Sequence, residues 1–327
     1  MKLRTRRADW ELATPLHITA RSFAQAYTVV VELTDGRFMG RGECNGAYYR
    51  GETQATMEAE IERARPQIEK GIDRSALRQL MPAGGARNAV DAALWDLEAK
   101  RAGTRAWTLA GLTEIRPLVT AFTVGVDTPE KMGAAAAAAA TRKLDVLKLK
   151  LTGDDDLARV AAVRAGHPHA RIIVDANQGW SERHLREFPR ELARLGVELI
   201  EQPLRAGADD LLEGFESPVP FCADESCQTL LSVPALVGKY QFVNIKLDKC
   251  GGLTEALLLA QDARARGLRL MVGCMLGSSL GMAPAFIVGQ RCEFVDLDAP
   301  LLQVNDIEHG IRYDGNVMAP PEPRLWG

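Results

Sequence analysis

The sequence has no long apolar run. No stretch of about 18 consecutive apolar residues, roughly the minimum for a membrane-spanning helix, occurs among its 327 residues. The start, MKLRTRRADWEL, lacks the apolar core of a signal peptide. The net charge is only −3 and the sequence pI is about 6.0, so the chain offers no basic surface for nucleic acid or anionic lipid. We therefore expect a cytoplasmic protein that binds neither nucleic acid nor a membrane.

Cysteine is scarce and irregularly spaced. No C-x-x-C pair occurs, which disfavours a zinc site and a redox motif. Most of the cysteines lie within apolar runs, so we expect small buried thiols in a reducing compartment rather than a disulfide framework. The six residues are Cys44, Cys222, Cys227, Cys250, Cys274 and Cys292.

Glycine-rich phosphate-binding turns are also lacking. The pattern G-x-G-x-x-G does not follow the early strands, which disfavours an open, doubly wound dinucleotide-binding sheet. The composition is otherwise that of a soluble globular protein, with 46% hydrophobic and 25% charged residues. The length allows one large domain or two modest ones.

The first hundred residues predict a compact α+β unit. The segment YTVVVELTDGRFMGRGEC (27–44) has two β-rich runs around Asp35-Gly36, which indicates a hairpin. Helical patterns follow at 53–70, 74–80 and 86–102. Strands followed by helices are typical of an α+β unit.

From about residue 117, short apolar strands alternate with helical stretches. The alanine run 134–140 falls where a helix is due, and alanine is the best helix former. Strands each followed by a crossover predict a parallel α/β barrel, with the open doubly wound sheet as the alternative. The tail from about residue 305 adds no further helix–strand pair and could return to the first unit. The expected strands are 118–126, 145–151, 171–177, 197–203, 220–226, 242–248, 269–275 and 293–298.

Three successive strands of this barrel end in an acid. These are Asp175, Glu201 and Asp224, and barrel chemistry sits at the carboxyl ends of strands. A single acid after a strand is more often a helix N-cap, but three on successive strands are hard to explain as caps. Carboxylate oxygens that converge at a barrel mouth are the ligands that Mg²⁺ prefers. Other polar residues at strand ends are Asn177, Glu225, Lys246, Asp248, Cys274, Ser278, Asp296 and Asp298.

Two lysines stand close together in one of these strands. In DVLKLKLTG (145–153), Lys148 and Lys150 are two residues apart and therefore point to the same face. On this stretch alone, an edge strand with its lysines in water is as good an explanation as a buried site. The carboxylates and Lys246 favour a site that moves a proton at a carbon next to a carboxylate, since that reaction needs a base and a cation.

A lysine can serve as the base only if its pKa is lowered. A free lysine, with a pKa of about 10.4, is protonated at neutral pH. A neighbouring ammonium group, a dication and partial burial all disfavour the charged form. We therefore expect one lysine of the pair to act as the base, while its neighbour tunes it and meets charge on the substrate.

Ordered motifs extend over nearly the whole chain. They are KLK (148–150), VDANQGW (174–180), IEQP (200–203), ADES (223–226) and NIKLDKCGGLTEA (244–256), with ECNGAYYRGET and AGGARNAVDAALWDLEAK in the first unit. Together they resemble the muconate-lactonising subgroup of the enolase superfamily, and within it the dipeptide epimerases. The resemblance implies an α+β capping domain at 1–112, a modified (β/α)₇β barrel at 113–304, and a C-terminal segment at 305–327 that returns to the cap.

The resemblance also implies roles for the strand-end residues. Asp175, Glu201 and Asp224 would bind one Mg²⁺. Lys150 and Lys246 would be the acid/base catalysts, one on each face of the α-carbon, with Lys148 in support. One lysine would take the proton to form an enediolate, and the other would return a proton to the opposite face. A lysine or histidine base with Mg²⁺ is the general pattern of that superfamily.

The last strand narrows the subgroup. FVDLDAP places Asp296 and Asp298 on one face, and it resembles the D-x-D motif with which dipeptide epimerases hold the substrate's free amino terminus. Two carboxylates facing an ammonium group form strong charge-assisted hydrogen bonds. The alternative is a pair of solvated acids at a strand end. Muconate cycloisomerases and o-succinylbenzoate synthases have no amino group to hold, so this motif argues against them.

The side-chain specificity is less determined. Loops near 16–25 and 46–52 would cover the substrate's C-terminal residue, and glutamate-specific members use a basic residue in the first loop. In this sequence Arg21 is the basic residue of the first loop. The position where we expect the basic residue is instead occupied by Phe23, or by Ala24 if the alignment shifts by one residue. Further candidates for substrate contact are Tyr48, Tyr49, Arg50, Cys274 and Ser278, although Arg50 could equally be an ordinary loop arginine.

The sequence thus favours an isomerase that inverts the α-carbon of the C-terminal residue of a dipeptide, plausibly Ala-Glu from cell-wall peptide recycling. The first alternative is another reaction of the same fold, N-acylamino acid racemisation or cycloisomerisation. The second is a catalytically silent barrel that only binds peptide or metal. That alternative is disfavoured because all five positions for ligands and catalysts are filled. Barrels of this family often associate, which leaves a homo-oligomer open.

Overall fold

The computed structural model describes residues 1–19 and 21–327. Its N-terminal part is an antiparallel three-stranded sheet in the order β1-β2-β3, with helices packed beside it. The strands are β1 (Lys2–Ile18), β2 (Arg21–Thr34) and β3 (Met39–Cys44), and the helices are α1 (Gln54–Glu69), α2 (Arg74–Leu80), α3 (Gly85–Ala102) and α4 (Ala106–Leu109). A short 3₁₀ helix, η1 (Tyr48–Arg50), joins the sheet to α1. We call these elements the cap.

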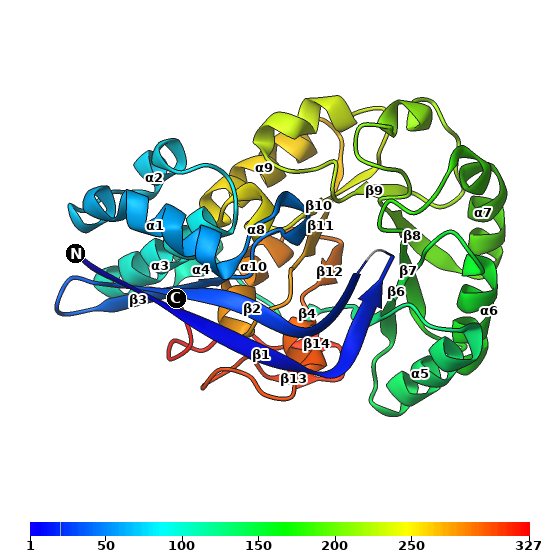
Figure 1. The fold of residues 1–327 in the computed structure, drawn as a ribbon, viewed down its shortest axis with the longest axis horizontal. Coiled ribbons are helices and arrows are strands. Elements are labelled where there is room, and N and C mark those ends of the chain that lie inside the picture. Colours follow the sequence, from blue (N-terminus) through cyan, green and yellow to red (C-terminus); the bar gives the residue numbers. More distant parts are fainter. Residues whose placement is uncertain (20) are drawn as a thin grey trace.

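The predicted hairpin and helices of the cap are confirmed, but β1 was missed. Thr34 pairs with Met39, and the Asp35 carboxylate accepts hydrogen bonds from two backbone N–H groups in the turn between β2 and β3. β1 escapes the sequence pattern because only Leu3 and Leu12 of its 17 residues are buried, so apolar and polar residues do not alternate. Figure 1 shows the long β1–β2 hairpin (blue) reaching from the cap helices toward the barrel.

The rest of the chain forms an eight-stranded parallel barrel. Its strands follow in the order β5 to β12, and the backbone N–H of Ala121 donates to Val295 O at 2.8 Å, which joins the two outer strands. This confirms the expected modified barrel with a capping domain. The strands are β5 (Phe122–Val124), β6 (Val146–Lys150), β7 (Arg171–Asp175), β8 (Val197–Glu201), β9 (Phe221–Ala223), β10 (Phe242–Ile245), β11 (Arg269–Gly273) and β12 (Phe294–Asp296).

Helices cover the outside of the barrel (Figure 1). The alanine run lies in α5, as predicted, and the crossovers on either side of β9 are 3₁₀ helices instead of α-helices. The connecting elements are α5 (Pro129–Thr141), α6 (Asp156–Gly166), α7 (Glu182–Arg194), η2 (Asp209–Leu212), η3 (Leu230–Leu236), α8 (Leu247–Cys250), α9 (Leu253–Ala265), α10 (Ser279–Gly289) and η4 (Ala299–Leu302). Within residues 1–19 and 21–327, no helix is both long and apolar enough to cross a membrane.

The predicted strand 118–126 is divided in two. β4 (Leu118–Val119) pairs with the C-terminal strand β14 (Val317–Met318), which also pairs with β13 (Tyr313–Asp314), whereas β5 pairs with β6 in the barrel. The chain changes partners at Thr120, whose N–H donates to Asn316 O and whose hydroxyl accepts from Leu297 N–H. The prediction of one continuous strand was wrong because hydrophobicity does not reveal which sheet a residue joins.

A ring of apolar side chains closes the barrel floor. One buried residue comes from each strand or the position just before it, so the interior at this level is packed with side chains. Side chains alternate along a strand, and the next interior position on each strand therefore lies one layer closer to the mouth. The floor residues are Ala121, Val146, Ile173, Leu199, Cys222, Phe242, Met271 and Phe294.

Buried polar contacts join the cap to the barrel. Glu43 of β3 accepts a hydrogen bond at 3.0 Å from the N–H of Ser278, the N-cap of α10. Asp91 of α3 accepts one at 3.0 Å from the N–H of Thr254 in the first turn of α9. The chain end also contacts the cap, because the N–H of Gly327 donates to Asp96 of α3 at 2.7 Å. These contacts fix where the β1–β2 hairpin stands over the barrel mouth.

The close approach of β3 to α3 generates a stability prediction. A Cβ atom on Gly42 would stand 2.2 Å from Ala89 O, so Gly42→Ala should separate the sheet from α3 and lower stability by about 1–3 kcal/mol. Gly281→Ala is the matched control, because its Cβ would meet nothing closer than 3.8 Å and alanine is the better helix former. Chemical denaturation followed by circular dichroism measures both. Equal midpoints for Gly42→Ala and the unmodified protein would contradict the packing described.

Candidate active site

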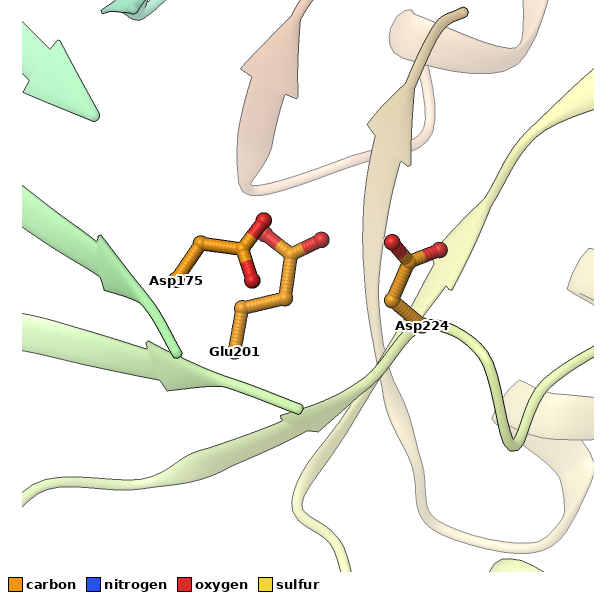
Figure 2. A group of neighbouring side chains, drawn as sticks. All are labelled: Asp175, Glu201 and Asp224. Atoms are coloured by element: carbon orange, nitrogen blue, oxygen red, sulfur yellow. The ribbon is translucent and has the colours of Figure 1, made fainter. Parts of the chain in front are cut away.

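Three buried carboxylates converge inside the barrel mouth. Asp175 ends β7, Glu201 ends β8 and Asp224 follows β9. Each acid stands two positions after the floor residue of its strand and therefore lies one layer closer to the barrel mouth. One oxygen from each carboxylate lies within 4.8 Å of the others. Figure 2 shows the three groups pointing into one shared space. The structure therefore brings together the acids that the sequence identified.

These oxygens are suitable ligands for a divalent cation. Glu201 Oε1 accepts a hydrogen bond from Asn244 Nδ2 at 2.7 Å. Within the described part of the chain, Glu201 Oε2 accepts no hydrogen bond of good geometry, although Lys148 Nζ lies 2.7 Å away. A buried carboxylate oxygen with an unused lone pair, beside two further carboxylates, fits the oxygen-rich coordination of Mg²⁺.

Three lysine ammonium groups face the carboxylates. Lys148 Nζ lies 2.8 Å from Asp296 Oδ2 and 3.3 Å from Asp175 Oδ2. Lys150 Nζ lies 2.7 Å from Asp175, and Lys246 Nζ lies 2.6 Å from Asp224. Lys148 is only 1% exposed, so the interpretation of β6 as an edge strand with solvated lysines was wrong.

Burial and charge shift the pKa values of these groups strongly. Burial alone would lower the pKa of Lys148, but the charges of Asp296, Glu201 and Asp175 outweigh it and raise the pKa well above its usual value. Burial, followed by the charge of Asp175, raises the pKa of Glu201 to about 7. At Asp224 the ammonium groups of Lys246 and Lys249 outweigh burial, and the pKa is lowered. The carboxylates and lysines thus form one interdependent cluster.

The cluster lies at the bottom of a cavity that is partly open to solvent. The barrel contributes the charged floor of the cavity and the cap contributes an apolar wall. Phe23 and Tyr48 pack edge to face there, with their ring centroids 5.4 Å apart. The lining also includes Leu16, Ile18, Tyr49, Leu276 and Leu302.

Six of the residues proposed to contact substrate line this cavity. Asp298 Oδ2 accepts the backbone N–H of Thr123 at 2.6 Å. Burial and then the charge of Asp296 raise the pKa of Asp298 to about 7. The six are Phe23, Tyr48, Tyr49, Cys274, Asp296 and Asp298.

The other three candidates lie outside the cavity lining. Arg21 is exposed, and its guanidinium carbon lies 5.3 Å from the centroids of both the Phe23 and Tyr48 rings. Arg50 donates to Lys249 O at 3.0 Å. Ser278 is buried as the N-cap of α10 and is hydrogen-bonded to Glu43.

Sequence reasoning missed two residues of the cluster. Asn244 lies on β10, two positions after the floor residue Phe242, so the alternation of side chains would have placed it in the barrel interior. Lys249 lies one helical turn after Lys246, and its ammonium group donates to Asp224 Oδ1 at 2.6 Å. A short helix directly after a strand gave no comparable pattern for Lys249.

Comparisons with known proteins agree with this arrangement. Residues 1–111 match the N-terminal domain model of mandelate racemase / muconate lactonizing enzyme, and residues 131–322 match the enolase C-terminal domain-like model. An L-Ala-D/L-Glu epimerase of Escherichia coli (strain K12) is 43% identical, over 93% of this chain and 95% of that protein. An N-acetyl-D-glutamate racemase of Pseudoalteromonas sp. is 42% identical, over 91% and 95%.

Solved structures are similar over the full length. An enolase family member from Agrobacterium tumefaciens with homology to dipeptide epimerases, solved with sodium and L-Ala-L-Glu bound, has a TM-score of 0.96 and 43% identity, covering 99% of both chains. A dipeptide epimerase from Methylococcus capsulatus, complexed with Mg and L-Arg-D-Lys, has a TM-score of 0.90 and 30% identity, covering 98% and 97%. The matched models and relatives cover the cap, the barrel and the carboxylate cluster, and the chain belongs to the mandelate racemase / muconate lactonizing enzyme family of the enolase superfamily.

Proposed function

We propose that the protein is a Mg²⁺-dependent dipeptide epimerase that inverts the α-carbon of the C-terminal residue. The position of the two lysines carries the proposal. Lys150 lies on β6 and Lys246 follows β10, and these strands are four places apart in the eight-stranded barrel. Their ammonium groups therefore face each other across the carboxylate cluster, as a reaction that exchanges a proton between two faces of a carbon requires.

Asp175, Glu201 and Asp224 would hold the metal ion, in keeping with the Mg-bound relative from Methylococcus capsulatus. When bound, Mg²⁺ would polarise the substrate carboxylate and neutralise the negative charge that develops as the α-proton leaves. Lys150 and Lys246 would each take the α-proton in one direction of the reaction and return a proton in the other. Lys148, held between Asp296 and the metal-binding carboxylates, would stay a cation and meet the substrate carboxylate.

Asp296 and Asp298 would hold the free ammonium group of the dipeptide. Both are buried on one side of the cavity, and an ammonium group would compensate the repulsion between them. The relative that racemises N-acetyl-D-glutamate, at 42% identity, supports a second candidate, the racemisation of N-acylamino acids. Such a substrate carries no ammonium group, so the two candidates differ in whether these carboxylates are needed.

The apolar wall of the cavity would hold the side chain of the dipeptide's C-terminal residue. Tyr48 and Phe23 line the same cavity as Lys246 and Asp224, so the side chain on the reacting carbon would meet these two rings. Among the described lining residues, the cations are Lys148, Lys150 and Lys246, which are paired with carboxylates. We therefore propose that apolar C-terminal residues are accepted at least as well as glutamate. Turnover of Ala-Glu would suit the recycling of cell-wall peptides in the cytoplasm.

Proton NMR in D₂O with Mg²⁺ tests the reaction and the substrate class together. We expect loss of the C-terminal α-proton and a new diastereomer for L-Ala-L-Glu, L-Ala-L-Leu and L-Ala-L-Phe. The rates for the two apolar dipeptides should equal or exceed the rate for L-Ala-L-Glu. N-acetyl-L-glutamate and metal-free enzyme are the controls and should show no exchange. Exchange only in N-acetyl-L-glutamate would replace the dipeptide proposal with racemisation, and turnover without metal would contradict the ligand assignment.

Lys150→Met and Lys246→Met test the two-base mechanism. Methionine keeps the unbranched lysine side chain up to its last carbon but has no ammonium group to carry a proton, so each variant should lose epimerisation by at least about 10²–10⁴-fold. One variant can still exchange solvent deuterium into a single enantiomer, because the remaining lysine serves one face. Far-UV circular dichroism checks the fold. A folded single variant that epimerises at the normal rate is incompatible with two opposed bases.

The buried pair at the amino-terminal subsite predicts a pH dependence. The pKa of Asp298 is raised to about 7, so below that pH the carboxyl becomes neutral and loses its attraction for an ammonium group. At saturating Mg²⁺, KM for the dipeptide should therefore rise as the pH falls below about 7, approaching tenfold per unit. Asp298→Asn should have a high KM that does not change with pH between 5.5 and 8.5. If KM changed with pH equally in Asp298→Asn and in the unmodified protein, a group other than Asp298 would be responsible for the pH dependence.

A further inference from the structure

The ammonium group of Lys249 is buried and fully engaged. Lys249 belongs to α8, the short helix that follows β10, and it is 1% exposed. Its Nζ donates to Asp224 Oδ1 at 2.6 Å and to Asn244 O at 3.0 Å. It also donates to the backbone carbonyl of Asp224. Since Lys249 is absent from the cavity lining, it contacts the metal-binding residue without facing the substrate.

Each of the three carboxylates is held in the same way. One oxygen accepts a hydrogen bond from a donor outside the shared space, and the other oxygen lies beside the ammonium group of Lys148, Lys150 or Lys246. For Asp175 the outer donor is the N–H of Asn177, at 2.9 Å from Oδ1. For Glu201 it is Asn244 Nδ2, at 2.7 Å from Oε1. For Asp224 it is Lys249, and Oδ2 is left to Lys246 at 2.6 Å.

Lys249 also links Asp224 to Asn244, the outer donor of Glu201. Asn244 donates its side chain to Glu201, and its backbone carbonyl accepts from Lys249. The same ammonium group therefore fixes Asp224 after β9 and Asn244 on β10. Without it, Asp224 Oδ1 would be a buried carboxylate oxygen without its donor, and the carboxylate would be free to rotate toward Lys246.

We propose that Lys249 is a positioning residue that orients Asp224 for metal binding. The inference rests on the Mg²⁺ site of the proposed function. Outer donors to metal-binding carboxylates fix the ligand geometry, and their loss typically costs about 10–100-fold in metal affinity or activity. Removing a positive charge near the site would on its own strengthen cation binding. A fall in affinity would therefore identify orientation, rather than charge, as the main contribution of Lys249.

Calorimetric titration of the metal-free protein with Mg²⁺ tests the inference without any substrate. Lys249→Met should raise the Kd for Mg²⁺ by about 10–100-fold, while kcat with a dipeptide recovers at saturating Mg²⁺. Lys249→Arg keeps the donor and should bind Mg²⁺ more tightly than Lys249→Met. Lys239→Met is the control, since it removes a lysine paired with Asp210 before β10, away from the carboxylates, and should leave the Kd unchanged.

The outcomes separate the two proposals. If the unmodified protein binds no Mg²⁺, the proposed function fails in its metal requirement and takes this inference with it. If it binds Mg²⁺ and folded Lys249→Met binds equally well, only the role of Lys249 is refuted. A loss of affinity in Lys239→Met as large as that in Lys249→Met would also refute it. If circular dichroism shows that Lys249→Met does not fold, Lys249→Gln replaces it. The same rise in Kd is expected, because the glutamine side chain is one atom shorter than that of lysine.

Discussion

Mutual compensation of buried charges is the constraint on which the barrel mouth depends. Asp175, Glu201 and Asp224 could not remain ionised in the interior without cations, and Lys148 could not remain charged there without anions. Such a cluster adds little to overall stability, because desolvation offsets most of the attraction, yet removal of one member can cost several kcal/mol. The importance of the cluster therefore lies in its geometry. It holds three carboxylates and three lysines close together in a site where each charge acts strongly.

The alternation of side chains along each strand places this cluster. Residues that face the interior at the floor are apolar, and those one step closer to the mouth are charged or polar, except for Gly273 on β11. Val146 and Lys148 on β6, or Phe294 and Asp296 on β12, show the change from one layer to the next. The packed floor excludes water from below, while the cap restricts it from above. The charged layer is thus open mainly toward the cavity that the substrate would enter.

The sequence predicted the barrel and its charged layer well because both follow from local patterns. The carboxylates end apolar runs at regular spacing, and the two-residue separation of Lys148 and Lys150 is a direct property of a strand. Contacts between residues far apart in the sequence were harder to predict. The break at Thr120 depends on Asn316, far away in the sequence, and β1 is a strand because of β2 and not because of its own pattern. Arg50 and Ser278 looked like site residues because they lie beside the motifs, but their side chains contact Gln228 and Glu43 outside the cavity.

The cavity is a joint product of the cap and the barrel. The hydroxyl of Thr19, near the end of the β1–β2 hairpin, donates to Leu151 O at 2.7 Å, directly after Lys150. The carbonyl of His17 accepts from the N–H of Val126 at 2.8 Å. These contacts hold the hairpin against the strand ends that bear the lysines and carboxylates, and they bring Phe23 over the charged floor. A substitution in the hairpin can therefore change which side chain fits while the carboxylates and lysines stay in place. The fit of the substrate side chain depends on the cap hairpin, whereas the carboxylates and lysines belong to the barrel. The specificity for a dipeptide can therefore change while the barrel stays the same.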